Sequence, residues 1–419
     1  MPTRVLLLGA HPARGHGLRR LSRLTAAAWH EAGADVSLAI APDPLSRRVP
    51  WGAAGDGLAA AESAAWLTAL LRRTGSDIDL VHVLDPRDVV YTASIRDRIP
   101  VTVTCHDLSG LADDEESGRR VHPLRRARAR AVQRALVKAD HLVPTSHFAA
   151  AELQRLIGVT GEVVHLPVDP ALAERPARID AWKPPAWPYL LIVGGPEPHT
   201  RRATSIQAWT NLRRTPALDG ASLVVVGPGL DAQEEALVTA CGGHVSVLSD
   251  VSDAQLGALY GRSRAVLALN RPRGFTWPVV EAHQAGRPVL ATDHEVFQEV
   301  GGAGCVYLPV EGVARFDAAT WVSIAEDLTA SLVRDRACVN AERFAWHRFV
   351  ERLPEVAFPE GSRPATTDPI PERAPERAPE PSPESIQLVP LPARVPARVG
   401  PAAATPVPPP MPLPVPVPR

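Results

Sequence analysis

The chain of 419 residues is poor in cysteine and in aromatic side chains, and its charges almost cancel. Four scattered cysteines without a paired spacing argue against a zinc site and against a disulfide framework. A net charge of -1 gives no overall field for nucleic acid or an anionic membrane, so such a partner needs a local patch. The apolar run at the N-terminus is too short for a signal sequence, and no later run approaches the roughly twenty residues of a membrane span. We therefore expect a cytoplasmic protein that binds no nucleic acid.

Short apolar runs that alternate with helical patterns are abundant instead. With 45% apolar residues and a length beyond that of a single core, the chain should form two domains. The alternation is typical of α/β folds with parallel sheets covered on both faces. One series of expected strands lies at residues 5–8, 36–40, 80–84, 101–105, 141–145 and 163–166. A second series lies at residues 189–194, 222–226, 244–248, 265–269, 289–292 and 305–308. Ligands of such doubly wound sheets bind at the carboxyl ends of the strands, here in a cleft between the domains.

Composition marks the expected boundaries. A proline-rich break at residues 175–188 separates an N-terminal domain, 1–174, from a second domain, 189–345, and is a candidate hinge. A helical stretch, 346–359, follows. Nineteen of the 44 prolines lie in the last 59 residues, so the tail, 360–419, cannot fold alone. It is either a dispensable disordered extension or a docking strip for the aromatic groove of a protein partner.

The most informative stretch is residues 273–302, which reads as a turn, a helix, a buried strand and a second helix start. Gly274 and Pro278 bracket a tight loop, and the helix after it ends at Gly286. A loop that leads into a helix start presents unpaired backbone N–H groups, which suit a diphosphate. Glu281, one turn into the helix, can reach sugar or ribose hydroxyls.

This stretch resembles the donor-site signature of the retaining GT-B glycosyltransferases of family four, EGFGLPxxEAxxxGxPVxAxDxxxxxEV. The matching residues are Gly274, Phe275, Pro278, Glu281, Ala282, Gly286, Pro288, Val289, Ala291, Asp293, Glu299 and Val300. The resemblance implies two Rossmann-like domains that face each other across a cleft. It also implies metal-independent transfer from a nucleotide-diphosphate sugar, with no cofactor. Arg273 departs from the signature, because it replaces the first glutamate of the family's pair.

Two stretches of the N-terminal domain strengthen the resemblance. Gly15 and Gly17, after the first expected strand, resemble the family's glycine-bearing first loop and would let backbone approach the donor. The run TVTCHDL resembles the family's TVHDL at the cleft face, and implies that His106 faces the transferred sugar. In a third stretch, Ser146 is expected to cap the following helix, an architectural role.

The second domain opens on a run, residues 189–209, that resembles the family's YxLxVGGxxPRKNxxxLxxAF. Gly194 and Gly195 match, but the basic pair that usually holds the diphosphate falls on His199 and Thr200. A guanidinium one or two residues later can replace that charge. The resemblance thus assigns the donor to the following residues: Gly194, Gly195, Arg201, Arg202, Gly274, Phe275, Thr276, Trp277 and Glu281, with Val251 beside the nucleobase.

Other patterns leave alternatives open. Asp77 and Asp79 spell the DxD of metal-dependent glycosyltransferases, but they stand directly before a strand. The arginines from Arg119 to Arg134 fit either a solvated helix or peripheral contact with the inner membrane face or a phosphate-bearing acceptor.

We expect a glycosyltransferase in which His106 and Arg273 act at the reacting sugar, with an acceptor that the sequence does not identify. Arg273 can only donate hydrogen bonds, which favours a donor sugar with a carboxylate. Two alternatives remain. One is a catalytically degenerate GT-B protein that binds or activates a partner, and the other is a sugar-nucleotide epimerase or hydrolase on the same fold.

Overall fold

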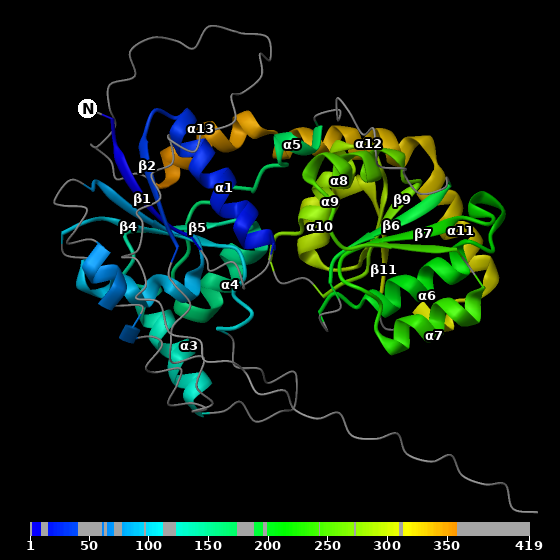
Figure 1. Cartoon of the computed structure of the whole chain (residues 1–419), viewed down its shortest axis with the longest axis horizontal. Helices are drawn as coiled ribbons and strands as arrows, with labels where there is room; N and C mark the ends of the chain where they lie inside the picture. The colour runs from blue at the N-terminus through cyan, green and yellow to red at the C-terminus, as the bar shows by residue number, and fades with distance from the viewer. Residues whose placement is uncertain are drawn as a thin grey trace, which may run out of the picture. The chain divides into compact units, whose positions relative to one another are not determined.

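A computed structural model describes residues 2–9, 16–40, 61–62, 65–70, 78–95, 98–111, 123–173, 188–195, 199–242, 244–271, 274–309 and 313–357. Gly15, Arg273, nearly all of the expected hinge and the proline-rich tail lie outside the described residues. Two parallel sheets organise the rest, and both lie within one compact unit of the chain (Figure 1).

The first sheet has five strands in the order β2-β1-β3-β4-β5. They are β1 (Arg4–Gly9), β2 (Asp35–Ile40), β3 (Leu80–Val83), β4 (Val101–Cys105) and β5 (His141–Pro144). Side chains from alternate strand positions fill a core on each face. One core includes Val5, Leu7 and residues of α1 (His16–Glu31). The other includes Leu6, Val81 and residues of α3 (Pro123–Leu136) and α4 (His147–Ile157).

The second sheet has six strands in the order β11-β10-β9-β6-β7-β8. They are β6 (Tyr189–Val193), β7 (Ser222–Val226), β8 (Val245–Leu248), β9 (Ala265–Ala268), β10 (Val289–Thr292) and β11 (Cys305–Leu308). One core contains residues of α6 (Arg202–Leu212) and α11 (Ala318–Thr329). The opposite core contains residues of α8 (Asp253–Arg262), α9 (Trp277–Gln284) and α10 (Glu295–Gly301). The expected α/β class, with doubly wound parallel sheets, is confirmed.

Shorter helices and peripheral helices complete the described part of the chain. They are η3 (Pro86–Ser94), α5 (Pro170–Ala173), η5 (Pro216–Leu218), α7 (Ala232–Cys241), η6 (Gly302–Gly304), η7 (Val313–Arg315), α12 (Ser331–Ala341), η8 (Glu342–Phe344) and α13 (Trp346–Ala357). Ser146 caps α4 as expected, because its side chain accepts a hydrogen bond from the Ala149 N–H at 3.0 Å.

The expected strand at residues 163–166 is wrong. That segment is extended but pairs with β5 through one backbone bond, from the Val164 N–H to the Pro144 carbonyl at 3.0 Å. In a parallel ladder the return bond to the Val164 carbonyl would come from the N–H of residue 146, but β5 ends at Pro144 and Ser146 is already the N-cap of α4, so the chain turns away before a second bond forms. The first sheet therefore ends at β5.

Helix α13 returns the chain from the second sheet to the core of the first. Phe349, Leu353 and Ala357 are buried in the core that also holds Val5 and Trp29. The Thr102 hydroxyl, on β4, donates to the Ala357 carbonyl at 2.8 Å. The last described helix is thus bonded to the first sheet at its very end.

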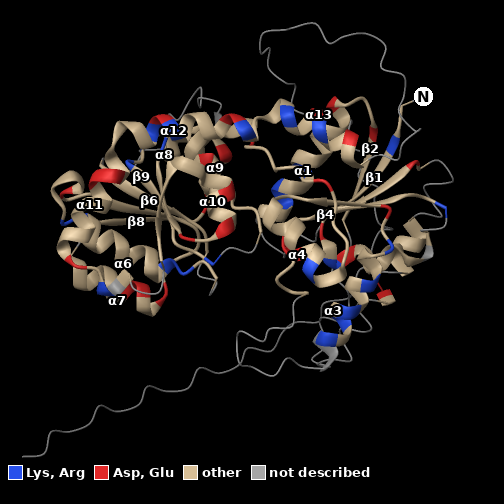
Figure 2. Cartoon of the chain, turned by 180° about the vertical axis from the view of Figure 1, so that it is seen from behind, with Lys and Arg blue, Asp and Glu red and all other residues tan. Residues whose placement is uncertain are grey.

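Helix α3 carries a concentration of positive charge, visible as blue segments in Figure 2. It includes the described part of the arginine stretch between Arg119 and Arg134, whose membrane contact stays a prediction. Within the part of the chain that the structure describes, no helix combines the length and apolar character needed to cross a membrane.

A buried polar chain joins α1 to the middle of the first sheet. The Trp29 indole N–H donates to His82 Nδ1 at 3.0 Å, and His82 Nε2 bonds the Thr104 hydroxyl at 2.8 Å. Burial lowers the pKa of His82 to about 3. The imidazole is therefore neutral in the folded protein at neutral pH.

Because His82 is buried in its neutral form, we expect the fold to lose stability in acid. Unfolded histidine has a pKa of about 6.5, so between about pH 6.5 and the folded value only the unfolded chain binds the proton. Stability should therefore be full above that range and fall as the pH drops, by up to about 1.4 kcal/mol per pH unit for this group. Urea unfolding at several pH values measures the slope, which should be shallower in His82→Gln. Identical slopes in both proteins would contradict the assignment.

Candidate functional site

The loop before α9 rests directly on the backbone of His106. Gly274 has a φ of 120°, a region that favours glycine, and a Cβ there would lie 1.4 Å from the His106 carbonyl oxygen. Only glycine fits this position. Gly274 and His106, two predicted site residues, are thus in contact. His106 follows β4 of the first sheet, and Gly274 precedes α9 beside the second sheet.

The His106 side chain is enclosed at the end of β4. Its Nδ1 has no hydrogen-bond partner among the described residues. Burial lowers the pKa of His106, although the carboxylates of Asp85 and Asp107 act in the opposite direction. A neutral imidazole with an unused nitrogen is suited to bond a ligand hydroxyl.

The start of α1 approaches the same loop. A Cβ on Gly17 would lie 3.4 Å from Cζ3 of Trp277, so the Trp277 ring covers this glycine. The Trp277 indole N–H donates to the Pro167 carbonyl at 3.1 Å, and Phe275 packs edge-on against the Trp277 ring at 6.1 Å between centroids. Gly17, Phe275 and Trp277 therefore meet at one place.

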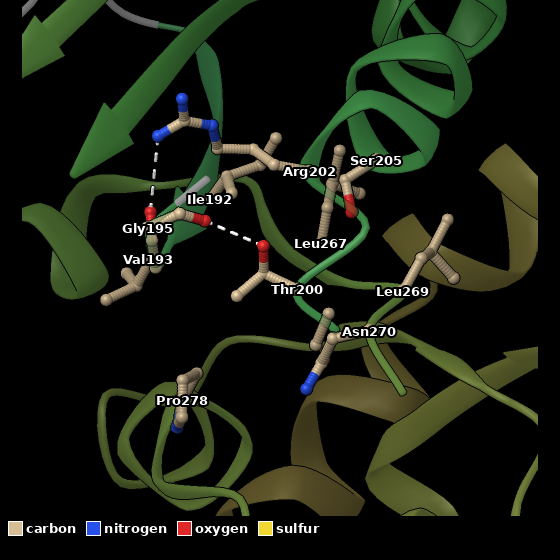
Figure 3. Close-up of a pocket in the computed structure, with 12 residues that line it drawn as sticks. Ile192, Val193, Gly195, Thr200, Arg202, Ser205, Leu267, Leu269, Asn270 and Pro278 are labelled. Carbon is tan, nitrogen blue, oxygen red and sulfur yellow. Dashed lines mark hydrogen bonds between the residues drawn. The ribbon is translucent and has the colours of Figure 1, made fainter. Parts of the chain in front are cut away.

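A small pocket opens at the carboxyl ends of β6 and β9. Its lining includes Gly194, Gly195, Thr200, Asn270 and Pro278, and Pro278 stands across it from the glycine turn (Figure 3). Thr276 is the N-cap of α9, and its side chain makes no capping hydrogen bond within the described residues. Pro278 has no N–H, and the Val279 N–H donates to the Thr276 carbonyl at 3.2 Å, so the first turn of α9 leaves only part of its usual N–H groups for an anion. The pocket volume is about 50 Å³, far below the roughly 300 Å³ of a small ligand site, so a whole nucleotide does not fit.

The two candidate arginines beside the pocket, Arg201 and Arg202, differ in their surroundings and backbone conformation. The Arg202 guanidinium is buried, forms an ion pair with Glu234, and donates to the carbonyls of Pro228 at 2.9 Å and Gly229 at 2.7 Å. Arg202 thus ties the start of α6 to the loop after β7 and to α7. Arg201, at the N-cap of α6, has a positive φ of 43°, a strained conformation for a residue with a side chain. Such strain is common at functional sites. Thr200 hydrogen-bonds the Gly195 carbonyl at 2.7 Å and so closes the glycine turn.

Glu281 lies in an ion-pair network that the sequence did not reveal. Arg20, on α1, donates to one Glu281 oxygen, and the Tyr260 hydroxyl donates to the other at 2.7 Å. The guanidinium of Arg20 also reaches Asp253 Oδ1 at 3.1 Å and lies 3.6 Å from Asp169. No local pattern signals these partners, because Arg20 and Glu281 are 261 positions apart.

Burial shifts the pKa values of the charged groups in this network. Burial raises the pKa of Glu281 although Arg20 and the Tyr260 hydroxyl act to lower it. Burial alone would lower the pKa of Arg20, but the attraction of Glu281 and Asp253 raises it above its ordinary value. The Glu281 carboxylate therefore depends on Arg20 to remain charged. Val251, the residue expected beside the nucleobase, is half-buried and packs against the core that contains Tyr260.

Comparison with known proteins agrees with this geometry. Residues 15–172 match the model of Glycosyltransferase Family 4, and residues 187–322 match that of Glycosyl transferases group 1. The sucrose-phosphate synthase of Thermosynechococcus elongatus superposes with a TM-score of 0.62 at 16% identity, over 84% of this chain and 98% of that one. HepE of Anabaena, solved with UDP and glucose, superposes with a TM-score of 0.61 at 16% identity and the same coverage.

Curated sequence relatives match over a shorter stretch. The serotype-specific mannosyltransferase WbdA of Escherichia coli is 33% identical over 81 residues, which are 19% of this chain. The match spans 10% of the length of that relative.

Two parallel α/β sheets whose strand ends meet at a glycine-lined site define the fold as GT-B. The chain belongs to the group 1 glycosyltransferases of this fold, a family of enzymes that transfer glycosyl groups.

The network around Glu281 predicts that Arg20→Met destabilises the fold. Removing one partner of a buried ion pair costs about 3–5 kcal/mol, because the other charge stays buried without compensation. Arg19→Met, an exposed neighbour on α1, is the matched control and should change stability by less than about 0.5 kcal/mol. Urea unfolding measures both, and adding Glu281→Gln to Arg20→Met should recover part of the loss. Equal effects of the two arginine variants would show that the pair contributes little.

Proposed function

We propose that the protein is a retaining glycosyltransferase that takes a nucleotide-diphosphate sugar as donor and needs no metal for transfer. The observation that carries this proposal is that Gly274 contacts His106, Gly17 contacts Trp277 of α9, and Pro278 of α9 lines the pocket beside Gly194. These groups supply backbone approach, hydrogen-bond donors and a neutral imidazole. Such groups suit a diphosphate and a sugar together.

In this proposal the diphosphate lies at the start of α9, near the pocket beside Gly194 and Gly195. Arg201 or Arg202 is the candidate for its charge, and Arg202 would have to exchange its bonds to Glu234 and two carbonyls to serve. The positive end of the α9 dipole and the arginine would stabilise the negative charge that develops as the diphosphate leaves. The acceptor then attacks on the face that the diphosphate leaves, which retains the anomeric configuration. His106 would bond a hydroxyl of the transferred sugar.

Glu281 is the proposed residue that binds the ribose, and to do so it must give up a hydrogen bond within the protein. Both of its oxygens are bonded within the protein, to Arg20 and to Tyr260. A ribose that bonds Glu281 therefore displaces Arg20, whose guanidinium can turn to a phosphate oxygen instead.

The contact between Arg20 and Glu281 also favours a second candidate function. If Arg20 holds Glu281 permanently, the protein is a GT-B member without catalysis that binds a partner. Titration with UDP, the nucleotide in the HepE structure, separates the two candidates. A ligand at 100 times its dissociation constant stabilises the fold by about 2.7 kcal/mol, which thermal unfolding detects. No shift with any nucleoside diphosphate would favour the second candidate.

Glu281→Gln should weaken nucleotide binding, because the charged acceptor for the ribose hydroxyls is lost. A hydrogen bond to a charged group contributes about 1.5–3 kcal/mol, or roughly tenfold to more than a hundredfold in affinity. Calorimetric titration with UDP measures this change. Glu295→Gln, an exposed glutamate on α10, is the control and should bind like the wild type. Unchanged affinity in Glu281→Gln would assign the carboxylate to the Arg20 network alone.

Arg273 is proposed to select the donor sugar. A guanidinium gains a charge-assisted contact from a carboxylate, whereas a glutamate accepts from neutral hydroxyls. The wild type should therefore prefer a nucleotide-uronic acid to plain nucleotide-hexoses, and Arg273→Glu should shift the preference towards the hexoses. Donor competition in a hydrolysis or transfer assay measures the ratio. A ratio that the variant leaves unchanged would mean that the side chain does not contact the sugar.

A further inference from the structure

Three potential metal ligands meet away from the proposed donor site. His147 begins α4, His165 lies in the extended segment after α4, and Glu299 is on α10. One ligand atom from each lies within 4.8 Å of the others, and His165 Nε2 is 2.9 Å from Glu299 Oε1. The cluster joins two segments of the first sheet's domain to a helix of the second.

The Glu299 carboxylate is oriented and charged. It accepts hydrogen bonds from the backbone N–H groups of His147 at 2.7 Å and Phe148 at 3.0 Å, at the start of α4. Burial alone would raise the pKa of Glu299, but His165 and these two N–H groups lower it below its ordinary value. Outer hydrogen bonds of this kind hold a metal-ligating carboxylate in place.

The His147 imidazole has no role in that capping arrangement. Its ring stands edge-on to the His165 ring, with 5.9 Å between centroids. It is exposed and makes no hydrogen bond within the described part of the chain. A helix cap and a His165–Glu299 pair explain two residues of the cluster, whereas a shared cation explains all three.

We propose that His147, His165 and Glu299 bind a zinc ion. Two imidazole nitrogens and one carboxylate oxygen are a donor set that zinc prefers, with a fourth position for water, whereas Mg²⁺ and Ca²⁺ prefer oxygen ligands alone. The exposed His147 ring can rotate to bring its nitrogen to the roughly 2.0–2.1 Å of a zinc–imidazole bond. The ligands are far apart in sequence and include no cysteine, so cysteine spacing gives no sign of them.

Bound zinc would tie α4 to α10 beside the donor loop. The His165 ring packs edge-on against Phe344 at 5.4 Å, and Phe344 packs against Phe275 of the donor loop at 5.7 Å. Zinc therefore has a structural role here, and the proposal is independent of how the donor is bound.

Titration of the metal-free, full-length protein with Zn²⁺ tests the site. The wild type should bind one zinc in calorimetry and unfold at a higher temperature with it. His147→Ala should weaken zinc binding by more than about tenfold, because loss of a residue that only hydrogen-bonds a metal ligand already costs that much affinity. His347→Ala, an exposed histidine at the start of α13, should bind like the wild type.

Cobalt as a spectroscopic substitute identifies the ligands. Co²⁺ should give visible bands of low coordination that His147→Ala loses, without the near-ultraviolet charge-transfer band of a thiolate such as the exposed Cys338. Equal zinc affinity in the wild type and His147→Ala, a thiolate band, or no binding would each overturn the proposal. Glu299 would then serve only to cap α4 and pair with His165.

Discussion

The buried carboxylate of Glu281 is the constraint on which the candidate site depends. A charge removed from water needs compensation, and the nearest cation, Arg20, comes from a helix of the other sheet. Satisfying Glu281 therefore holds α1 against α8 and α9. The contacts of Gly17 with Trp277 and of Gly274 with His106 occur at the same junction. The pairing of Glu281 with Arg20 thus occurs where the segments that carry Gly17 and Gly274 come into close contact.

If Glu281 binds the ribose as proposed, the same requirement makes the junction a switch for a ligand. Arg20 and the ribose would then compete for one carboxylate, and an arginine released from it would have a partner in a diphosphate. Nucleotide binding would proceed by exchange of partners rather than by addition of a ligand to an empty site. Arg202 illustrates the opposite case, because its guanidinium is bonded to Glu234 and to the carbonyls of Gly194, Pro228 and Gly229.

A second junction, at Glu299, joins the two halves of the molecule independently. The start of α4 would present unpaired N–H groups, and the carboxylate from α10 accepts two of them. Phe344 links this junction to Phe275 through ring contacts, so the loop before α9 lies between two points at which elements of the two sheets are in contact. A cation bound at His147 and His165 would strengthen the outer tie.

The sequence by itself determined the two parallel sheets, eleven of their strands and the helix that follows Gly274, because periodicity, glycine and helix caps act within a few residues of each other. It misjudged residues 163–166, where apolar character suggested a strand but β5 gives way to the N-cap of α4 at Ser146 after a single bond to Val164. It could not distinguish Arg201 from Arg202, since only packing shows that Arg202 is bonded to Glu234. Arg20, Tyr260 and the cluster at Glu299 were decided by tertiary structure alone. Their partners lie as far as 261 positions away, and such contacts leave no local pattern in a chain.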